Sequence, residues 1–113
     1  MADLAAQSVN GEITLSSISA ASTYANDERT LLLVKVSASG RVVTVSTNRT
    51  AVTVAAFGTL TVSNIAVTST GSNYIAIQAP PASYNNTTNG KASFTMNTYT
   101  STTAAAIRLN NIS

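Results

Sequence analysis

The acidic residues are the first place to look for chemistry in this chain, because it contains no histidine and no cysteine. Its carboxylates are Asp3, Glu12, Asp27 and Glu28, and Arg29 directly follows the last two. Adjacent carboxylates can ligate Ca²⁺, but calcium sites gather several oxygen ligands at a defined spacing, which this sequence lacks. We therefore interpret residues 27–29 as a solvated turn that leads into a strand.

Enzyme chemistry has few candidate groups here. Without histidine or cysteine the chain lacks the usual general acid–base group and the thiolate nucleophile. A small hydrolase with a carboxylate pair remains an alternative, and it would need Asp27 or Glu28 to lie about 5–10 Å from Asp3 or Glu12 across a cleft. There is no Ser-x-x-Lys spacing and no glycine-rich phosphate loop. We expect no catalytic residue, no cofactor, no metal and no small-molecule substrate.

Charge content narrows the possible partners. Charged residues make up 9% of the 113 positions, against about 25% in an average globular domain. The net charge is +2 and the six cations are scattered singly, whereas nucleic-acid binding needs clustered cations that neutralise adjacent phosphates. The first residues lack a basic and an apolar signal region, and no apolar run is long enough to span a bilayer. We expect neither nucleic acid nor a membrane as partner.

Apolar residues recur mostly with a period of two, which is typical of β-strands. We predict an all-β chain: a single antiparallel β-sandwich or jelly-roll-like domain of about eight short strands over residues 13–113, with an extended N-terminal arm or edge segment at 1–12. No helix is convincing, although Ala2–Gln7 could form one turn. The predicted strands are 12–16 (an edge strand), 30–36, 41–46, 51–54, 59–62, 74–77, 91–96 and 103–109, with 17–26 as a loop.

Several details of this sandwich follow from the same pattern. Strands 30–36 and 41–46 are predicted to form a hairpin around Gly40, and Asn48-Arg49 and Asn89-Gly90 are predicted turns. A change of parity predicts a bulge or corner near Ser63-Asn64. The expected inward-facing sets are Leu32, Val34 and Val36; Ile75 and Ile77; Ala92, Phe94 and Met96; and Ile107 with Leu109.

The segment from Ala79 to Asn86 is the most informative element outside the strands. Pro80 and Pro81 fix the backbone and lack donor N–H groups, so the segment cannot be a central strand. We predict an ordered, stiff loop with Tyr84 at its tip. Such a loop would bind a partner surface with little loss of entropy, and it could equally serve as a rigid crossover between two sheets.

The order of these segments resembles the small proteins that decorate or cement the capsid exterior of tailed bacteriophages. The resemblance covers roughly residues 27–109 and is carried by three stretches and the Val/Thr-rich strands between them. They are Asp27-Glu28-Arg29-Thr30-Leu31-Leu32-Leu33-Val34-Lys35, Pro80-Pro81-x-x-Tyr84-Asn85 with a Gly90-Lys91 strand, and Ala105-Ala106-Ile107-Arg108-Leu109. Position 79 departs from the pattern, because Ala79 stands where a larger aromatic or glycine-bearing segment is expected.

The resemblance implies a non-enzymatic virion protein, made in the host cytoplasm, that binds the major capsid protein on the capsid exterior as a homotrimer. The residues assigned as candidate capsid or subunit contacts are Asp3, Leu4, Gln7, Pro80, Pro81, Tyr84 and Asn85. Because residues 1–10 lack core periodicity, their deletion is expected to weaken attachment more than folding. The alternative is a phage tail-tip or fibre domain that binds a host surface glycan, with Tyr74, Tyr84 and Tyr99 gathered in a shallow groove.

Overall fold

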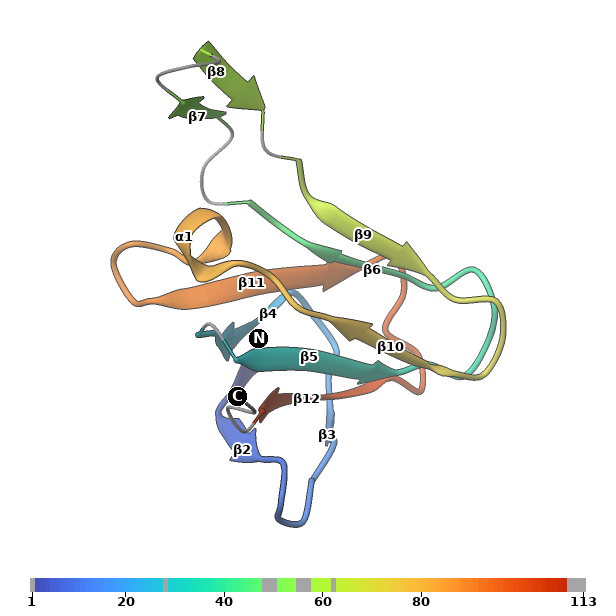
Figure 1. Cartoon of the computed structure of the whole chain (residues 1–113). Coiled ribbons are helices and arrows are strands. Elements are labelled where there is room, and N and C mark those ends of the chain that lie inside the picture. The colour runs from blue at the N-terminus through green and yellow to red at the C-terminus, as the bar shows by residue number, and fades with distance from the viewer. Residues whose placement is uncertain (1, 28, 48–50, 55–57, 62, 110–113) are drawn as a thin grey trace.

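The chain folds into two facing β-sheets and a separate two-stranded ribbon (Figure 1). The computed structural model describes residues 2–27, 29–47, 51–54, 58–61 and 63–109. The first sheet has the order β1 (Asp3–Leu4), β4 (Ser22–Ala25), β11 (Lys91–Met96), β6 (Val42–Val45), β9 (Ile65–Thr68). The second has the order β10 (Tyr74–Ile77), β5 (Thr30–Lys35), β12 (Thr103–Arg108), β2 (Ala6–Ser8), and β3 (Ser16–Ser17) also pairs with β12. The predicted all-β sandwich is confirmed.

Two elements lie outside these sheets. The ribbon consists of β7 (Ala51–Val54) and β8 (Gly58–Thr61), which pair with each other. One short helix, α1 (Pro81–Tyr84), follows β10. No helix in the described part of the chain is long and apolar enough to span a membrane.

The core lies between the sheets and follows the predicted alternation. Leu32, Val34 and Val36 on one side and Ala92 and Phe94 on the other are almost fully buried. Their alternation places every second residue in the core, because successive side chains of a strand point to opposite faces. The Tyr24 and Phe94 rings pack edge to face, with centroids 6.0 Å apart. These inward sets are therefore predictable from the sequence.

The N-terminal segment is extended and forms edges of both sheets. β1 pairs in parallel with β4, and β2 pairs in parallel with β12, so both sheets are mixed rather than wholly antiparallel. Leu4 is buried in the core. Residues 1–10 thus contribute a core side chain and two paired strands, which the lack of periodicity did not indicate. That their deletion weakens attachment more than folding stays a prediction.

The predicted hairpin of 30–36 with 41–46 is also wrong. β5 pairs with β10 and β12, whereas β6 pairs with β11 and β9 in the opposite sheet. Gly40 adopts a positive φ of 75° in the connection, and its N–H donates to the Ser69 carbonyl at 2.9 Å. The connection is thus an arch between sheets, and this hydrogen bond to a segment distant in sequence closes it.

Three other sequence assignments change. Residues 17–26 contain strand β4 rather than only a loop, and residues 12–15 are not a strand. In β12, Ala104 and Ala106 face the core, while Ile107 is buried on the opposite face. Gln7 is the register partner of Ile107 and its amide holds the Thr14 backbone. β2 and β3 both pair with β12, and the Gln7–Thr14 hydrogen bonds tie the segment between them back to β2.

Candidate functional site: a projecting ribbon and its base

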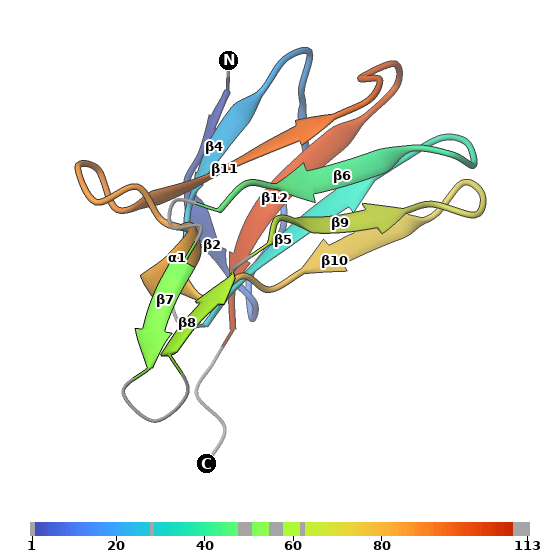
Figure 2. The same cartoon turned by 90° about the horizontal axis from the view of Figure 1, so that it is seen from above.

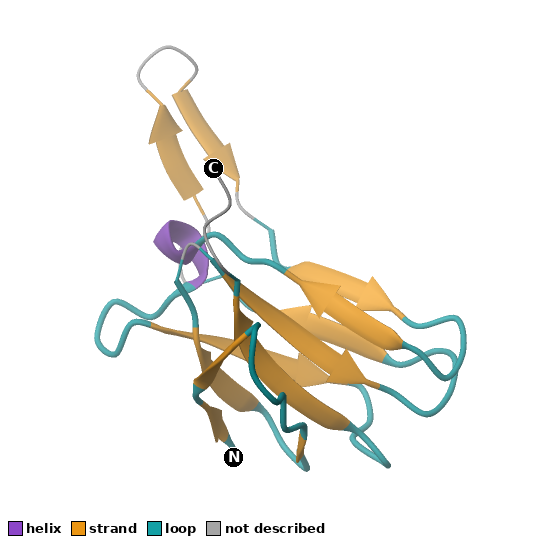
Figure 3. Cartoon of the chain, turned by 60° about the horizontal axis from the view of Figure 1, so that its bottom comes forward, coloured by secondary structure: helices purple, strands orange, loops and turns teal. Residues whose placement is uncertain are grey.

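The β7–β8 ribbon continues the β6–β9 pair of the first sheet and projects beyond the sandwich (Figures 1 and 3). Val45 pairs with Ile65, and Ala51 pairs with Thr61. Six positions separate Val45 from Ala51, but only four separate Thr61 from Ile65, so one side carries two extra residues. Figures 1 and 3 show β7 and β8 turned away from the body of the sandwich beyond these two connections.

The base of the ribbon is fastened by two hydrogen bonds from outside its own strands. The Thr47 N–H donates to Asn64 Oδ1 at 2.9 Å and joins the two sides of the bend. The Tyr84 hydroxyl donates to the Ser63 carbonyl at 2.8 Å. The predicted corner near Ser63-Asn64 is confirmed, and it is the point at which the ribbon is attached to the helix α1.

Tyr84 is buried and supports the base of the ribbon like a buttress, instead of lying exposed at the tip of a loop. Its side chain is 9% exposed and belongs to the core cluster. Pro80 and Pro81 begin the helical turn, where a proline loses no intrahelical hydrogen bond. The Asn85 N–H then donates to the Pro81 carbonyl at 3.1 Å. The expected aromatic tip is wrong because this turn directs the ring inward, while Pro80 stays exposed.

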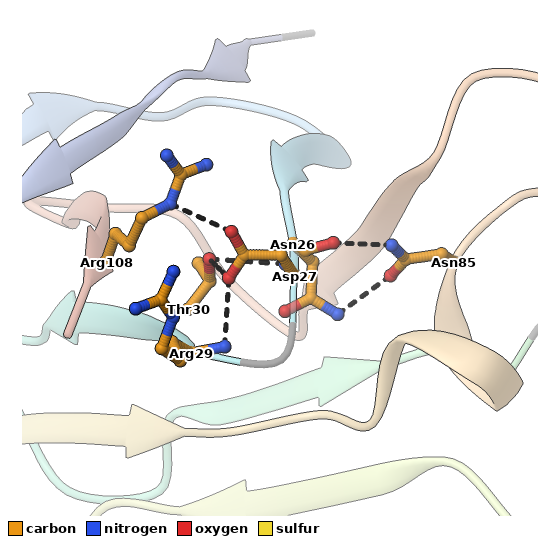
Figure 4. Close-up of polar contacts among 6 residues, drawn as sticks. All are labelled: Asn26, Asp27, Arg29, Thr30, Asn85 and Arg108. Atoms are coloured by element: carbon orange, nitrogen blue, oxygen red, sulfur yellow. Dashed lines mark hydrogen bonds and ion pairs between the residues drawn. The ribbon is translucent and has the colours of Figure 1, made fainter. Parts of the chain in front are cut away.

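A reciprocal pair of amides fixes α1 to the turn between β4 and β5 (Figure 4). Asn26 Nδ2 donates to Asn85 Oδ1 at 2.7 Å, and Asn85 Nδ2 donates to the Asn26 carbonyl at 2.6 Å. Asn26 Nδ2 also donates to the Ala79 carbonyl, and Asn85 Nδ2 to the Gly90 carbonyl. One buried asparagine thus holds both ends of the proline segment, which gives the Tyr84 ring a fixed position.

Asp27 completes this turn in the way the solvated-turn interpretation expects (Figure 4). Its Oδ1 accepts from the Arg29 N–H at 2.9 Å and from the Thr30 hydroxyl at 2.8 Å. Its Oδ2 pairs with Arg108 Nε at 2.8 Å. The Arg29 N–H and the Thr30 hydroxyl, helped by the Arg108 charge, hold the pKa of the Asp27 carboxyl below its usual value. Glu28 lies outside the described residues.

The N-terminal candidate contacts lie apart from the proline segment in three different settings. Asp3 is exposed on β1 and binds Lys91 and the Thr23 hydroxyl, which lower the pKa of its carboxyl. Leu4 is a core residue. Gln7 holds the Thr14 backbone through both ends of its amide, at 2.8 Å each. None of these arrangements tests a contact with a partner, so the assignments stay predictions.

Two hollows are lined by described residues, one along the proline segment and one at the base of the ribbon. One, of about 340 Å³, lies along Gln78, Ala79, Pro80 and Pro81. The other, of about 60 Å³, is polar and is lined by Ser46, Thr47, Tyr84, Asn86, Lys91 and Ser93. No carboxylate is among the described residues that line either hollow. The described residues also include no cluster of three acidic side chains that could hold a metal ion.

The tyrosines do not gather in a groove. Tyr74 is 57% exposed on β10, with Lys35 Nζ 5.8 Å from its ring centroid. Tyr84 is buried, and Tyr99 is half-buried with its hydroxyl accepting from the Met96 N–H at 3.1 Å. The arrangement that would favour the glycan-binding alternative is therefore not formed by these three side chains.

Sequence reasoning found the strands of the ribbon but not its projection. The alternation in 51–54 and 59–62 predicts two strands, and nothing in it says that they leave the sandwich. The available signal was the parity change at Ser63-Asn64. Comparison of the chain with protein-family models, with curated proteins and with solved structures finds no match.

Proposed function

We propose that this chain is a structural virion protein, a capsid decoration or cement protein that binds the exterior of a phage capsid and stabilises the assembled shell. It acts as a homotrimer, its partner is the major capsid protein, and it carries no catalytic site. The sequence resemblance over residues 27–109 suggests this function. The observation that carries it is the ribbon, a narrow β-extension fastened at its base by Ser63, Asn64 and Tyr84.

Two structural features and one general argument support a binding role. The ribbon projects from a two-sheet body and is fastened at its base by the Thr47–Asn64 and Tyr84–Ser63 hydrogen bonds, so its direction is largely set before it binds. The described hollows carry hydroxyl, amide and one ammonium group, a set without a general base. Trimerisation would multiply modest contacts with the shell into stable attachment, because binding of the second and third subunits becomes intramolecular.

The test is direct binding of the purified protein to expanded empty heads. Stoichiometric occupancy of symmetry-related positions is the expected result, and absent or random decoration would overturn the proposal. Because the contacts are not a basic patch, attachment should persist in about 0.5 M salt, where the screening length is only a few ångströms.

Two variants test whether decoration requires the ribbon. In the first, residues 48–62 are replaced by a short Asn-Gly turn, and loss of decoration is expected. The matched control is Ser39→Lys in the turn between β5 and β6, which Figure 1 places at the other end of the sandwich. The control should decorate normally. Both variants must show a cooperative urea transition, so that lost binding is not mistaken for lost folding.

A further inference from the structure

Two strand edges lie side by side on one side of the sandwich (Figure 2). β9 ends the first sheet and β10 ends the second. Each presents a row of backbone groups to solvent, and such a row is a template for another strand. The residues on the outer face of the sheet differ beside the two edges, and this difference favours β10 as the edge to which a further strand adds.

The outward groups of β10 follow from its pairing with β5. The Val36 N–H donates to the Asn73 carbonyl at 3.0 Å, so these two residues form a hydrogen-bonded pair. Hydrogen-bonded and non-bonded pairs alternate in an antiparallel ladder. The N–H and C=O groups of Tyr74 and Ala76 therefore face away from β5. No described residue pairs with them.

The β10 edge lacks the devices that normally block strand addition. Tyr74-Ile75-Ala76-Ile77 contains no charge and no proline, the features that natural edges use against pairing. Beside it, Leu31 and Leu33 are only half-buried on the outer face of the second sheet. On the outer face beside β9 the corresponding positions are Thr44 and Thr95. The apolar half-buried residue on the outer face of β6 beside β9 is Val42. Strands added at β10 would therefore cover more apolar surface, from two leucines, than strands added at β9.

The β7–β8 ribbon also has strand edges that no described strand pairs with. A two-stranded ribbon is at best marginally stable alone in water, yet β7 and β8 pair only with each other among the described strands. The chain exposes 6473 Å², against about 5,800 Å² for a compact chain of its mass, an excess of roughly 670 Å². A standard interface buries about 800 Å² per partner. The excess surface therefore approaches what one subunit contact needs.

We propose that the β7–β8 ribbon of one copy pairs with the β10 edge of a second copy and extends its second sheet. β7, β8 and β10 are each four residues long, so one ribbon strand matches the length of the β10 edge. A ribbon-to-edge contact is head-to-tail, and three copies related by a threefold rotation would close such contacts into a ring, the form that the proposed homotrimer requires. This inference deepens the proposed function, on whose self-association it rests.

The experiment measures molar mass by light scattering over a dilution series, for the full chain and for edge variants. Ala76→Pro removes an outward N–H and should weaken self-association by about tenfold or more. Ala66→Pro is the matched control, because Ala66 has the same outward position in β9. It should leave the mass unchanged. Ala76→Lys and Ala66→Lys repeat the comparison without a proline, in case a proline disturbs folding.

A mixture distinguishes the head-to-tail contact from a symmetric one. The ribbon-excised variant retains its edge and Ala76→Pro retains its ribbon, so each should be monomeric alone and the two should form a one-to-one pair. Equal effects of the Ala76 and Ala66 variants, a monomeric full chain, or an oligomer that survives ribbon excision would overturn the inference. A monomer that still decorates heads refutes this contact and the proposed homotrimer but not capsid binding, whereas an oligomer that fails to decorate refutes capsid binding but not this contact.

Discussion

Removing one hydroxyl from Tyr84 tests whether α1 holds the base of the ribbon. The Tyr84 hydroxyl donates to the Ser63 carbonyl at 2.8 Å, and the ring packs in the core. Tyr84→Phe keeps the ring and removes only the hydrogen bond. A bond of this kind contributes about 1 kcal/mol net, so unfolding should become easier by this amount, about a fivefold change in the equilibrium.

The matched control is the same change at Tyr24. That side chain is fully buried, and its hydroxyl has no hydrogen-bond partner in the described part of the chain. A buried hydroxyl without a partner costs about 1–3 kcal/mol relative to a satisfied one. Tyr24→Phe should therefore leave stability unchanged or increase it. The same chemical change is therefore expected to lower the free energy of unfolding at Tyr84 but not at Tyr24.

Hydrogen exchange supplies the local measurement, and urea unfolding the global one. In Tyr84→Phe the amides of β7 and β8 should exchange about fivefold faster relative to those of β5, because local opening of the base no longer breaks this bond. In Tyr24→Phe this ratio should stay constant. Ribbon exchange that is unaffected by Tyr84→Phe, or a Tyr24→Phe variant that is the less stable of the two, would refute the assignment of Tyr84 as the buttress.

Three further predictions concern the N-terminal segment and the pH range. Leu4→Ala should lower the free energy of unfolding by about 2–4 kcal/mol in urea, because it removes a core side chain. Burial raises the pKa of Tyr24 to about 12, whereas an unfolded tyrosine titrates at about 10. The contribution of the neutral Tyr24 phenol to the free energy of unfolding is therefore complete below about pH 10 and is lost as the pH rises toward about 12. Tyr24→Phe should abolish this loss, which circular dichroism measures. The pKa of Asp27 is lowered in the fold, so its contribution is complete above about pH 4 and is lost at lower pH; Asp27→Asn should flatten the acid limb of the stability profile.

Sequence alternation predicted those strands whose inner positions are large and apolar. β5 and β11 carry Leu, Val, Phe and Met at every second position, and burial of these side chains fixes their register. β4 was missed because Tyr24 is the only large apolar side chain in it. In β12 the inward residues are alanines and the bulky Ile107 is buried on the other face. The larger side chains of a strand therefore identify its inward face only where the opposite face is exposed.

Pairing partners were less predictable than strands, because they depend on contacts distant in sequence. The arch at Gly40 has the local signature of a hairpin, and it is the pairing of β6 with β11 and β9, distant in sequence, that places β6 in the other sheet. Tyr84 reads locally as a loop tip. Its inward direction depends on Asn26, which lies 59 positions before Asn85 and binds it. Long-range polar contacts of this kind leave no period in the sequence.

The sparse charges gain meaning from where the fold places them. Asp3 pairs with Lys91 and Asp27 with Arg108, so two of the cations are neutralised within the chain. The strands β7, β8, β9 and β10 contain no charged residue. A surface of this kind can be buried against a partner without removing unpaired charges from water, a step that costs several kcal/mol for each ion. The 9% charge content therefore leaves the ribbon and the β10 edge free to associate through backbone hydrogen bonds and apolar contact, which salt does not screen.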